Sequence, residues 1–258
     1  DPALLAEAAT LAAERGYDEI NLNVGCPSEK VRQGRFGACL MAEPQRVADC
    51  IAAMAHASGL PVTVKHRIGI DDLDSYDMLL HFVDTVAAGG ASRFAIHARK
   101  AWLNGLDPKQ NRTIPPLRYE LVHLLKQQRP ELTIELNGGL TSAEACLDQL
   151  QRVDGVMVGR AVYEHPLRWS WVDAGIHGLA SRDPLRASTV LRGLLDHAER
   201  WTSGGGRLWA IARHLVHLVE AVPGARHWRH QLSLAAANQS AGADVLERAA
   251  LQLEEQGL

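Results

Sequence analysis

The sequence lacks the features that mark metal-bound, disulfide-stapled or membrane-spanning proteins. Its four cysteines, at positions 26, 39, 50 and 146, form no Cys-x-x-Cys pair, which argues against a structural zinc site and against a secreted disulfide framework. No apolar run approaches the ~20 residues that span a bilayer, and the first residues show no basic and apolar signal-like regions. We therefore expect a cytoplasmic protein with no metal, no membrane and no evident protein partner.

An excess of charge of one sign is also missing. The formal net charge is -3, which excludes a uniformly basic nucleic-acid binder but allows a local basic patch. From Gly175 onward there is no lysine, and nine arginines stand against eight acidic residues. The preceding part carries 18 basic and 22 acidic residues, a net charge of -4. The change in composition indicates two parts.

Short apolar strands alternate with amphipathic helices in the first part. This alternation is typical of parallel βα units. Polar residues follow nearly every strand, as they do at the active-site end of a (β/α)8 barrel. We expect strands at Glu19–Val24, Pro61–Arg67, Arg93–Ala98, Leu132–Asn137 and Gly155–Val158, and helices at Pro2–Arg15, Glu43–Ser58, Ser75–Ala88, Pro116–Gln128 and Ser142–Leu150.

These elements predict an α/β fold in two domains. Residues 1–172 are expected to form about the last five βα units of a (β/α)8 TIM barrel, with roughly 90 residues of barrel upstream. Residues 175–258 are expected to form an all-helical domain, with helices broken at Ser203–Gly206 and at Pro223–Gly224.

Cys26 is the strongest catalytic candidate. It stands in the turn Asn23-Val-Gly-Cys-Pro-Ser28, between a predicted strand and the Gly-rich stretch Gly34–Leu40. A thiol on a strand-to-helix turn is a candidate acid or nucleophile. Cys39 and Cys50 are expected instead to be small core hydrophobes.

Further candidates follow the other strands. Glycines in Asn137-Gly138-Gly139 and at Gly159, beside Arg160, would let backbone amides approach a phosphate. Lys65 is expected near the barrel mouth as a cation facing a cofactor or substrate, and His97 as a contact to a phosphate or a ring. A basic loop cluster suited to a polyanion comprises Arg67, Arg99, Lys100, Lys109 and Arg112.

The helical tail carries a mixed basic and aromatic segment, Arg226-His-Trp-Arg-His230. Cations beside an aromatic ring suit phosphates and unstacked bases. From composition alone, a solvated helix face explains the segment equally well.

Three long motifs resemble the tRNA-dihydrouridine synthases, specifically subfamily A. They are Asn23-Val-Gly-Cys-Pro-Ser-Glu-Lys-Val31, Gly34-Arg-Phe-Gly-Ala-Cys-Leu40 and His97-Ala-Arg-Lys-Ala-Trp-Leu-Asn-Gly-Leu106. Pro223-Gly-Ala-Arg226 and Trp228-Arg229 are similar to the family's helical tRNA-binding domain. The family's first strand, with its flavin-contacting Pro-Met segment, has no counterpart in the sequence.

The resemblance implies an FMN-bound barrel that uses NADPH to reduce uridine at position 20 or 20a of the tRNA D-loop. It implies that Cys26 is the proton donor, that Lys65 and His97 contact the flavin, and that Asn137, Gly138, Gly139, Gly159 and Arg160 form phosphate loops. We assign contacts with tRNA to Asn23, Arg67, Arg99, Lys100, Arg226, Trp228 and Arg229.

The chemistry of this reaction is consistent with the residues. A hydride delivered to C6 of a uracil leaves negative charge at C5 and O4, and an acid such as the Cys26 thiol must then protonate C5. Three alternatives stay open: a free-pyrimidine flavin dehydrogenase resembling dihydroorotate dehydrogenase, a truncated and catalytically silent tRNA-binding fragment, and a structural protein.

Overall fold

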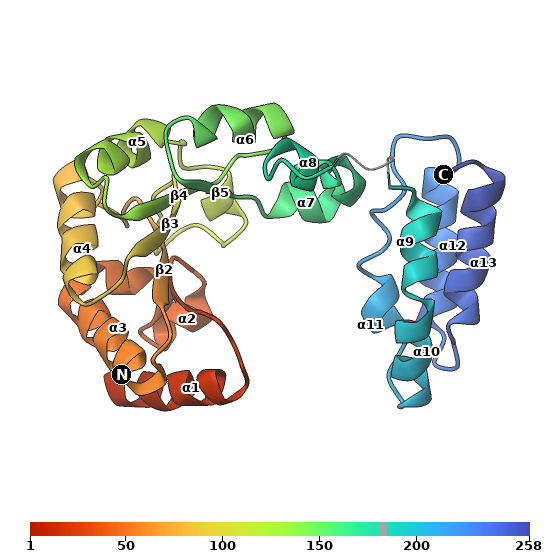
Figure 1. Cartoon of the computed structure of the whole chain (residues 1–258), viewed down its shortest axis with the longest axis horizontal. Helices are drawn as coiled ribbons and strands as arrows, with labels where there is room; N and C mark the ends of the chain where they lie inside the picture. Colours follow the sequence, from red (N-terminus) through yellow and green to blue (C-terminus); the bar gives the residue numbers. More distant parts are fainter. Residues whose placement is uncertain (181–184) are drawn as a thin grey trace. The chain divides into compact units, whose positions relative to one another are not determined.

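The chain folds into two compact units. The structure, a computed structural model, describes residues 1–180 and 185–258, and the units comprise Asp1–Val158 and Gly159–Leu258 (Figure 1). The domain boundary expected at 172–175 falls on the short helix α8 (Val172–Gly175) of the second unit and stays a prediction.

The first unit is built on one parallel sheet of five strands. Their order is β1-β2-β3-β4-β5, so each strand pairs with its neighbours along the chain. All five predicted strands are confirmed, each one residue shorter at one end. That they are the last five of eight barrel units stays a prediction. The strands are β1 (Ile20–Val24), β2 (Val62–Arg67), β3 (Arg93–His97), β4 (Thr133–Asn137) and β5 (Gly155–Met157).

Helices line one side of this sheet. Sequential parallel strands joined by right-handed crossovers place every connecting helix on the same face, and Figure 1 shows α3 to α6 along the outside of the curved sheet. The helices and short 3-10 turns are α1 (Pro2–Glu14), α2 (Glu29–Gln33), η1 (Gly37–Ala42), α3 (Pro44–Ser58), α4 (Tyr76–Ala88), η2 (Gln110–Arg112), α5 (Tyr119–Gln128) and α6 (Ala143–Leu150).

Local signals explain where the helices begin. Ser75 and Ser142 cap α4 and α6, since each hydroxyl accepts a backbone N–H of the first turn. Helix α5 begins at Tyr119 rather than at the predicted Pro116. The N–H of Arg118 instead donates to the Ala98 carbonyl (2.8 Å), which holds the preceding residues beside the end of β3.

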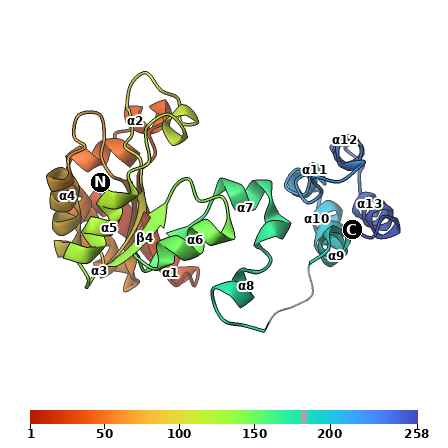
Figure 2. The ribbon, with the colours of Figure 1, turned by 90° about the horizontal axis from the view of Figure 1, so that it is seen from above.

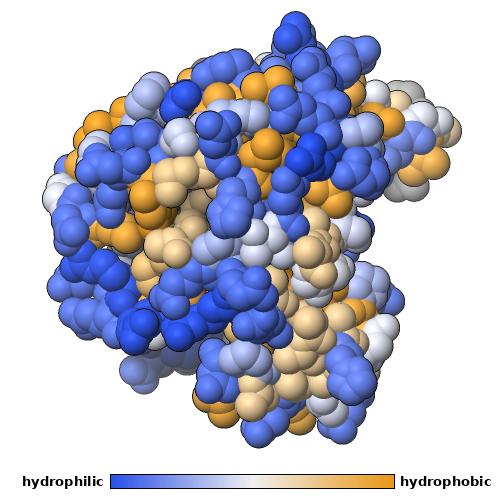
Figure 3. Space-filling model, turned by 90° about the vertical axis from the view of Figure 1, so that its left-hand side faces the viewer, coloured by the Kyte–Doolittle hydropathy of each residue, from blue (hydrophilic) through white to orange (hydrophobic). Residues whose placement is uncertain are grey.

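The two faces of the sheet have opposite character because alternate residues of a strand point to opposite sides. The face under the helices is apolar and fully buried, with Val64, Phe94, Ile96, Ile134 and Leu136 all at 0% exposure. The opposite face is polar. Pairing across the strands places Asn23 beside Lys65, and Arg67, His97 and Asn137 in one row. The outer surface of the helices is largely hydrophilic, with hydrophobic residues interspersed (Figure 3).

Among its described residues, the second unit contains helices, turns and loops but no strand. A single apolar core joins its last five helices, and Leu191, Leu246 and Leu253 are fully buried in it. The elements are α7 (Arg160–Glu164), η3 (Pro166–Trp169), α8, α9 (Ala187–Gly193), α10 (Leu195–Ser203), α11 (Trp209–Ala212), α12 (Ala225–Ala237) and α13 (Asp244–Glu255). Within residues 1–180 and 185–258, no helix is long and apolar enough to cross a membrane.

Candidate active site

A cleft of about 230 Å³ opens at the carboxyl ends of β1 to β4. It brings together seven residues singled out in the sequence: Asn23, Cys26, Lys65, Arg67, His97, Arg112 and Asn137. Gly25, Pro27 and Pro108 complete its lining. Strands β1 to β4 and the loops after them therefore converge on one site, as expected for an active site at the strand ends.

The turn that carries Cys26 is held by local bonds. The Asn23 side-chain oxygen accepts the Gly25 N–H (3.0 Å), and the Cys26 carbonyl accepts the Ala38 N–H (2.9 Å). Gly37 has φ +70°, and a Cβ there would lie 2.6 Å from the Cys26 carbonyl oxygen, so only glycine fits. The Cys26 thiol is partly exposed and lies 3.5 Å from the Ser28 hydroxyl. The turn thus presents a thiol to the cleft.

The other thiols are placed differently. Of the four cysteines, all within the described residues, Cys26 alone lines the cleft. Cys50 and Cys146 are buried, and burial raises the pKa of each thiol. The expectation that Cys39 is a core residue needs correction, because it is only partly buried and its Sγ donates to the Phe36 carbonyl (3.2 Å).

Lys65 supplies a tunable positive charge. It lies half-buried on the polar face of β2. Burial, and then the neighbouring charge of Arg67, lowers its pKa to about 8, while Glu135 opposes the shift. The ammonium is therefore mostly protonated at pH 7 and would gain from an anionic ligand.

The glycine pair after β4 packs tightly against the protein itself. Gly138 has φ +106°, and a Cβ there would lie 2.6 Å from Cδ2 of His97. Tyr119 donates its hydroxyl to the Gly138 carbonyl (2.6 Å) and would be 2.9 Å from a Cβ at Gly139. Sequence reasoning missed Tyr119, whose signal is a tyrosine at the start of the helix before a Gly-Gly loop. Asn137 donates to the Met157 carbonyl (2.7 Å), which joins β4 to β5.

Gly159 and Arg160 begin the second unit. Both are exposed, and a Cβ built on Gly159 meets no atom within 4 Å. The protein's own packing therefore does not require glycine at this position, and the space beside it is open. Their role in a phosphate loop stays a prediction.

Arg67 differs from its predicted role. Its side chain is 4% exposed, and it donates to the carbonyls of Gly25, Lys100 and Asn111 at 2.9, 3.1 and 3.0 Å. Burial lowers its pKa to about 10, so it stays charged at pH 7. We correct the expected contact with tRNA, because the guanidinium is covered and bonded to the protein.

The rest of the predicted basic cluster is also partly neutralised. Lys100 lies 2.9 Å from the Asp74 carboxylate, donates to the Asp71 carbonyl, and sits 4.1 Å above the Trp102 ring. Arg99 donates to the Pro115 carbonyl. The contact of Lys100 with tRNA stays a prediction, and the structure shows that its charge is already paired with Asp74. Lys109 and Arg112 are exposed, and Arg112 lines the cleft.

Asn111 is a second residue that sequence reasoning missed. It is 0% exposed. Its side-chain oxygen accepts the Trp102 N–H (2.8 Å), and its amide donates to the carbonyls of Trp102 (2.9 Å) and Leu106 (3.1 Å). Asn111 therefore organises the segment after β3, residues 98–118, which we call the β3 loop. A lone asparagine in a polar loop gave no sequence signal.

Helix α12 carries the three tail residues that were predicted to contact tRNA, and they differ in exposure. Arg226 is exposed, whereas Trp228 is 5% exposed and its Nε1 donates to the Ala249 carbonyl (3.4 Å). Arg229 is half-buried and donates to the Val219 carbonyl (3.4 Å). The expected contact of Trp228 with tRNA needs correction, because its ring belongs to the helical core.

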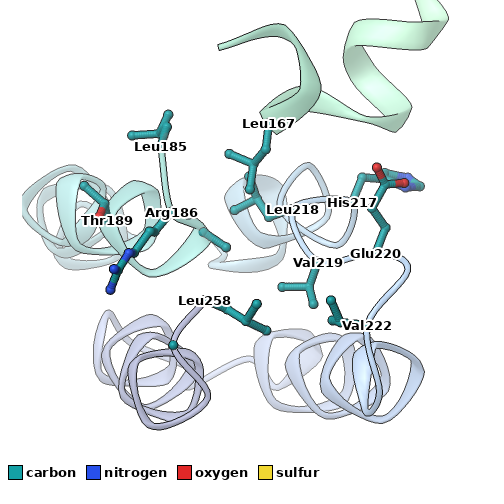
Figure 4. Close-up of a pocket in the computed structure, with 12 residues that line it drawn as sticks. Leu167, Leu185, Arg186, Thr189, His217, Leu218, Val219, Glu220, Val222 and Leu258 are labelled. Carbon is teal, nitrogen blue, oxygen red and sulfur yellow. The ribbon is translucent and has the colours of Figure 1, made fainter. Parts of the chain in front are cut away.

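The second unit also contains a larger hollow of about 1070 Å³ (Figure 4). Figure 4 shows Leu167, Leu218, Val219, Val222 and Leu258 around it, with Glu220 near its edge. Glu220 is already bonded to His165 and Arg168. None of the predicted site residues lines this hollow. No group of three or more His, Cys, Asp or Glu within the described residues could hold a metal ion.

Comparison with known proteins places the chain in one family. Residues 1–254 match the dihydrouridine synthase (Dus) family. A tRNA-dihydrouridine(20/20a) synthase of Synechocystis sp. is 53% identical over 96% of this chain and 74% of its own length. Proteins of the same name are 52% identical in Shewanella oneidensis, over 96% of this chain and 74% of theirs, and 51% identical in Escherichia coli (strain K12), over 96% and 72%. The chain therefore belongs to the dihydrouridine synthase family, whose members are flavin-dependent oxidoreductases.

Proposed function

We propose that this protein reduces the C5=C6 bond of uridine to dihydrouridine at position 20 or 20a of the tRNA D-loop. FMN is the proposed cofactor, NADPH the reductant and Cys26 the proton donor. The observation that carries the proposal is the cleft, in which Cys26 faces Lys65, His97 and Asn137. Relatives about half identical to the chain are named for this product.

The residues present suit a flavin phosphate and ring. Lys65 offers a positive charge, Gly138 brings backbone close to His97, and the space beside Gly159 is open. We assign cofactor contacts to Lys65, His97, Asn137, Gly138, Gly139, Gly159 and Arg160. When bound, FMN supplies the hydride that no side chain can supply.

The remaining chemistry falls to the chain's own side chains. As C6 gains a hydride, negative charge develops at C5 and O4 of the uracil. Cys26 then donates its thiol proton to C5 and becomes a thiolate, which regains a proton from solvent. Asn23, which fixes the Cys26 turn and lines the cleft, is positioned to orient the base.

Exposed cations supply the proposed contacts with tRNA. They are Lys109 and Arg112 in the β3 loop and Arg226 in α12, and the partly exposed Arg99 and Arg229 are proposed to add to them. We propose that this protein acts in the cytoplasm. We also propose that its five-stranded sheet is part of a TIM barrel.

Replacement of the thiol tests this function. We expect Cys26→Ala to lower dihydrouridine formation by ~10²–10⁴-fold, the usual contribution of a general acid, without loss of bound flavin or of tRNA affinity. Mass spectrometry of the tRNA gives the product, and the visible spectrum gives the flavin content.

Cys39→Ala is the matched control, because Cys39 is also partly exposed but lies outside the cleft lining. We expect its turnover to match that of the native protein. Unchanged turnover in Cys26→Ala would exclude Cys26 as the donor. Binding of tRNA without flavin or product would favour a tRNA-binding role instead.

A further inference from the structure

Arg67 joins three separate segments through one side chain. The ladder between β1 and β2 ends at the pair Val24 and His66. One residue further on, Nε of Arg67 donates to the Gly25 carbonyl, and NH1 donates to the carbonyls of Lys100 and Asn111. The Arg67 side chain thus extends the contact between strands and ties in the β3 loop at two points.

The Gly25 carbonyl belongs to the peptide unit that leads directly into Cys26. A bond to this oxygen therefore restrains the backbone of the residue that carries the thiol. The other two acceptors are the carbonyls of Lys100 and Asn111 in the β3 loop, and Arg112, the residue after Asn111, lines the cleft. One guanidinium consequently sets the position of Cys26 relative to the opposite wall of the cleft.

Burial and geometry separate this role from a contact with tRNA. Arg67 lines the cleft, but it is only 4% exposed and its guanidinium is already bonded to three carbonyls, so little of it is open to a phosphate or base. Two different nitrogens of its rigid planar guanidinium donate these bonds, Nε to the Cys26 turn and NH1 to the β3 loop. The single nitrogen of a lysine side chain cannot reproduce this arrangement.

We propose that Arg67 is a positioning residue that holds the Cys26 turn against the β3 loop and acts on the reaction through Cys26. This inference rests on the proposed function, since it assigns Arg67 a part in the proton transfer from Cys26. Misplacement of a reacting group by about 1 Å costs up to ~10²-fold in rate, and a loss of that order is expected when the three bonds are removed.

The test uses the flavin-loaded full chain with Arg67→Met, Arg67→Lys, Cys26→Ala and the double variant Cys26→Ala/Arg67→Met. We expect Arg67→Met to lower single-turnover dihydrouridine formation by about 10- to 100-fold. The Kd for tRNA and its salt dependence should not change. Arg67→Lys should not restore the rate. The double variant should be no slower than Cys26→Ala, because a residue acting through Cys26 adds nothing once the thiol is gone.

A readout independent of turnover is the alkylation rate of each thiol by iodoacetamide, measured residue by residue. Arg67→Met should change the rate at Cys26 several-fold and leave that at Cys39 unchanged. The matched control is Arg32→Met. The Arg32 side chain also donates to the β3 loop, at the Leu103 carbonyl (2.6 Å) and the Asn104 side chain. Its only bond to the Cys26 turn among the described residues is from the backbone N–H to the Ser28 carbonyl (2.9 Å), which Arg32→Met keeps. Figure 2 shows α2, which carries Arg32, beside this loop.

Different results would overturn the role of Arg67 and the proposed function. Rescue by Arg67→Lys together with a weaker, less salt-dependent affinity for tRNA would show that Arg67 contacts the substrate, and would overturn the proposal. So would equal effects of Arg32→Met and Arg67→Met on Cys26 alkylation, or an additional loss in the double variant. If the native protein forms no dihydrouridine, the proposed function is refuted. The alkylation rates would still show whether Arg67 holds the Cys26 turn against the β3 loop.

Discussion

At the scale of single residues, strand β2 determines most of the charge in the cleft. Lys65 and Arg67 point to the polar face and His66 to the apolar face, as strand alternation requires. The two cations differ in what they meet. Both line the cleft, but Arg67 is bonded to three carbonyls, whereas Lys65 is less buried and has its pKa lowered to about 8. Lys65 is therefore the cation suited to an incoming anion.

This difference predicts how flavin binding depends on pH. FMN should bind the protonated form of Lys65, so its affinity should fall as pH rises through about 8. The expected loss of affinity is about tenfold between pH 7 and pH 9, because the protonated fraction of Lys65 falls about tenfold over that interval. Quenching of FMN fluorescence on titration with the protein measures the Kd.

Lys65→Met should bind FMN more weakly and with little dependence on pH over the same range. Lys100→Met is the matched control, because Lys100 is paired with Asp74 outside the cleft lining, and it should keep the native dependence. An identical pH profile in Lys65→Met would show that Lys65 does not face the cofactor.

At the scale of elements, α12 shows that neighbouring residues of one helix can have opposite roles. Arg226 is exposed, while Trp228 lies in the core and bonds to Ala249 of α13. The basic face of α12 is available to a polyanion, and its aromatic residue packs α12 against α13.

Two substitutions in α12 should separate binding from stability. Arg226→Ala should weaken tRNA binding and reduce the slope of log affinity against log salt by ~0.7 to 0.9, with Tm unchanged. Trp228→Ala should instead lower stability by about 3–5 kcal/mol, the usual cost of emptying a core aromatic site. Filter binding at several salt concentrations and thermal unfolding measure the two effects.

Trp228→Phe is the control, because it keeps most of the buried volume. We expect it to retain native affinity for tRNA. Weaker binding in Trp228→Phe at an unchanged Tm would show that the ring contacts tRNA after all.

At the scale of the whole molecule, one buried histidine links folding to pH. His66 is 0% exposed, lies 5.0 Å from the Phe82 ring and 5.8 Å from the Phe94 ring, and bonds through Nδ1 to the Arg67 carbonyl (2.7 Å). Within the described residues its Nε2 has no hydrogen-bond partner. Burial lowers its pKa from 6.5 to about 3. Between about pH 3 and pH 6.5, His66 is therefore neutral in the folded chain and protonated in the unfolded chain.

This shift predicts a loss of stability in acid. Because the folded pKa is depressed, the contribution of His66 is complete above pH 6.5 and declines as pH falls from 6.5 towards 3. At pH 5 the expected loss is about 2 kcal/mol. His66→Asn keeps a donor for the Arg67 carbonyl but does not titrate. Urea unfolding at pH 7 and pH 5 should show a smaller decline for His66→Asn. Equal declines in the two proteins would refute this role.

Much of the fold followed from the sequence alone, because the signals involved are local. Short apolar runs between amphipathic helices located all five strands, and Ser75 and Ser142 marked helix starts. The converging site residues were also predictable in part. Polar residues at the ends of parallel strands share one edge of the sheet, and this placed Cys26, Lys65 and His97 in one cleft.

Only the tertiary structure decided which partners these residues meet. Arg67 bonds to Lys100 and Asn111, and Trp228 to Ala249; in each pair the residues are far apart along the chain. The sequence alone determined which residues carry charge, a thiol or an aromatic ring, and on which face of a strand they lie. Whether a charge stays open to a ligand or is bonded within the protein depends on the packing of distant segments, which no local pattern encodes.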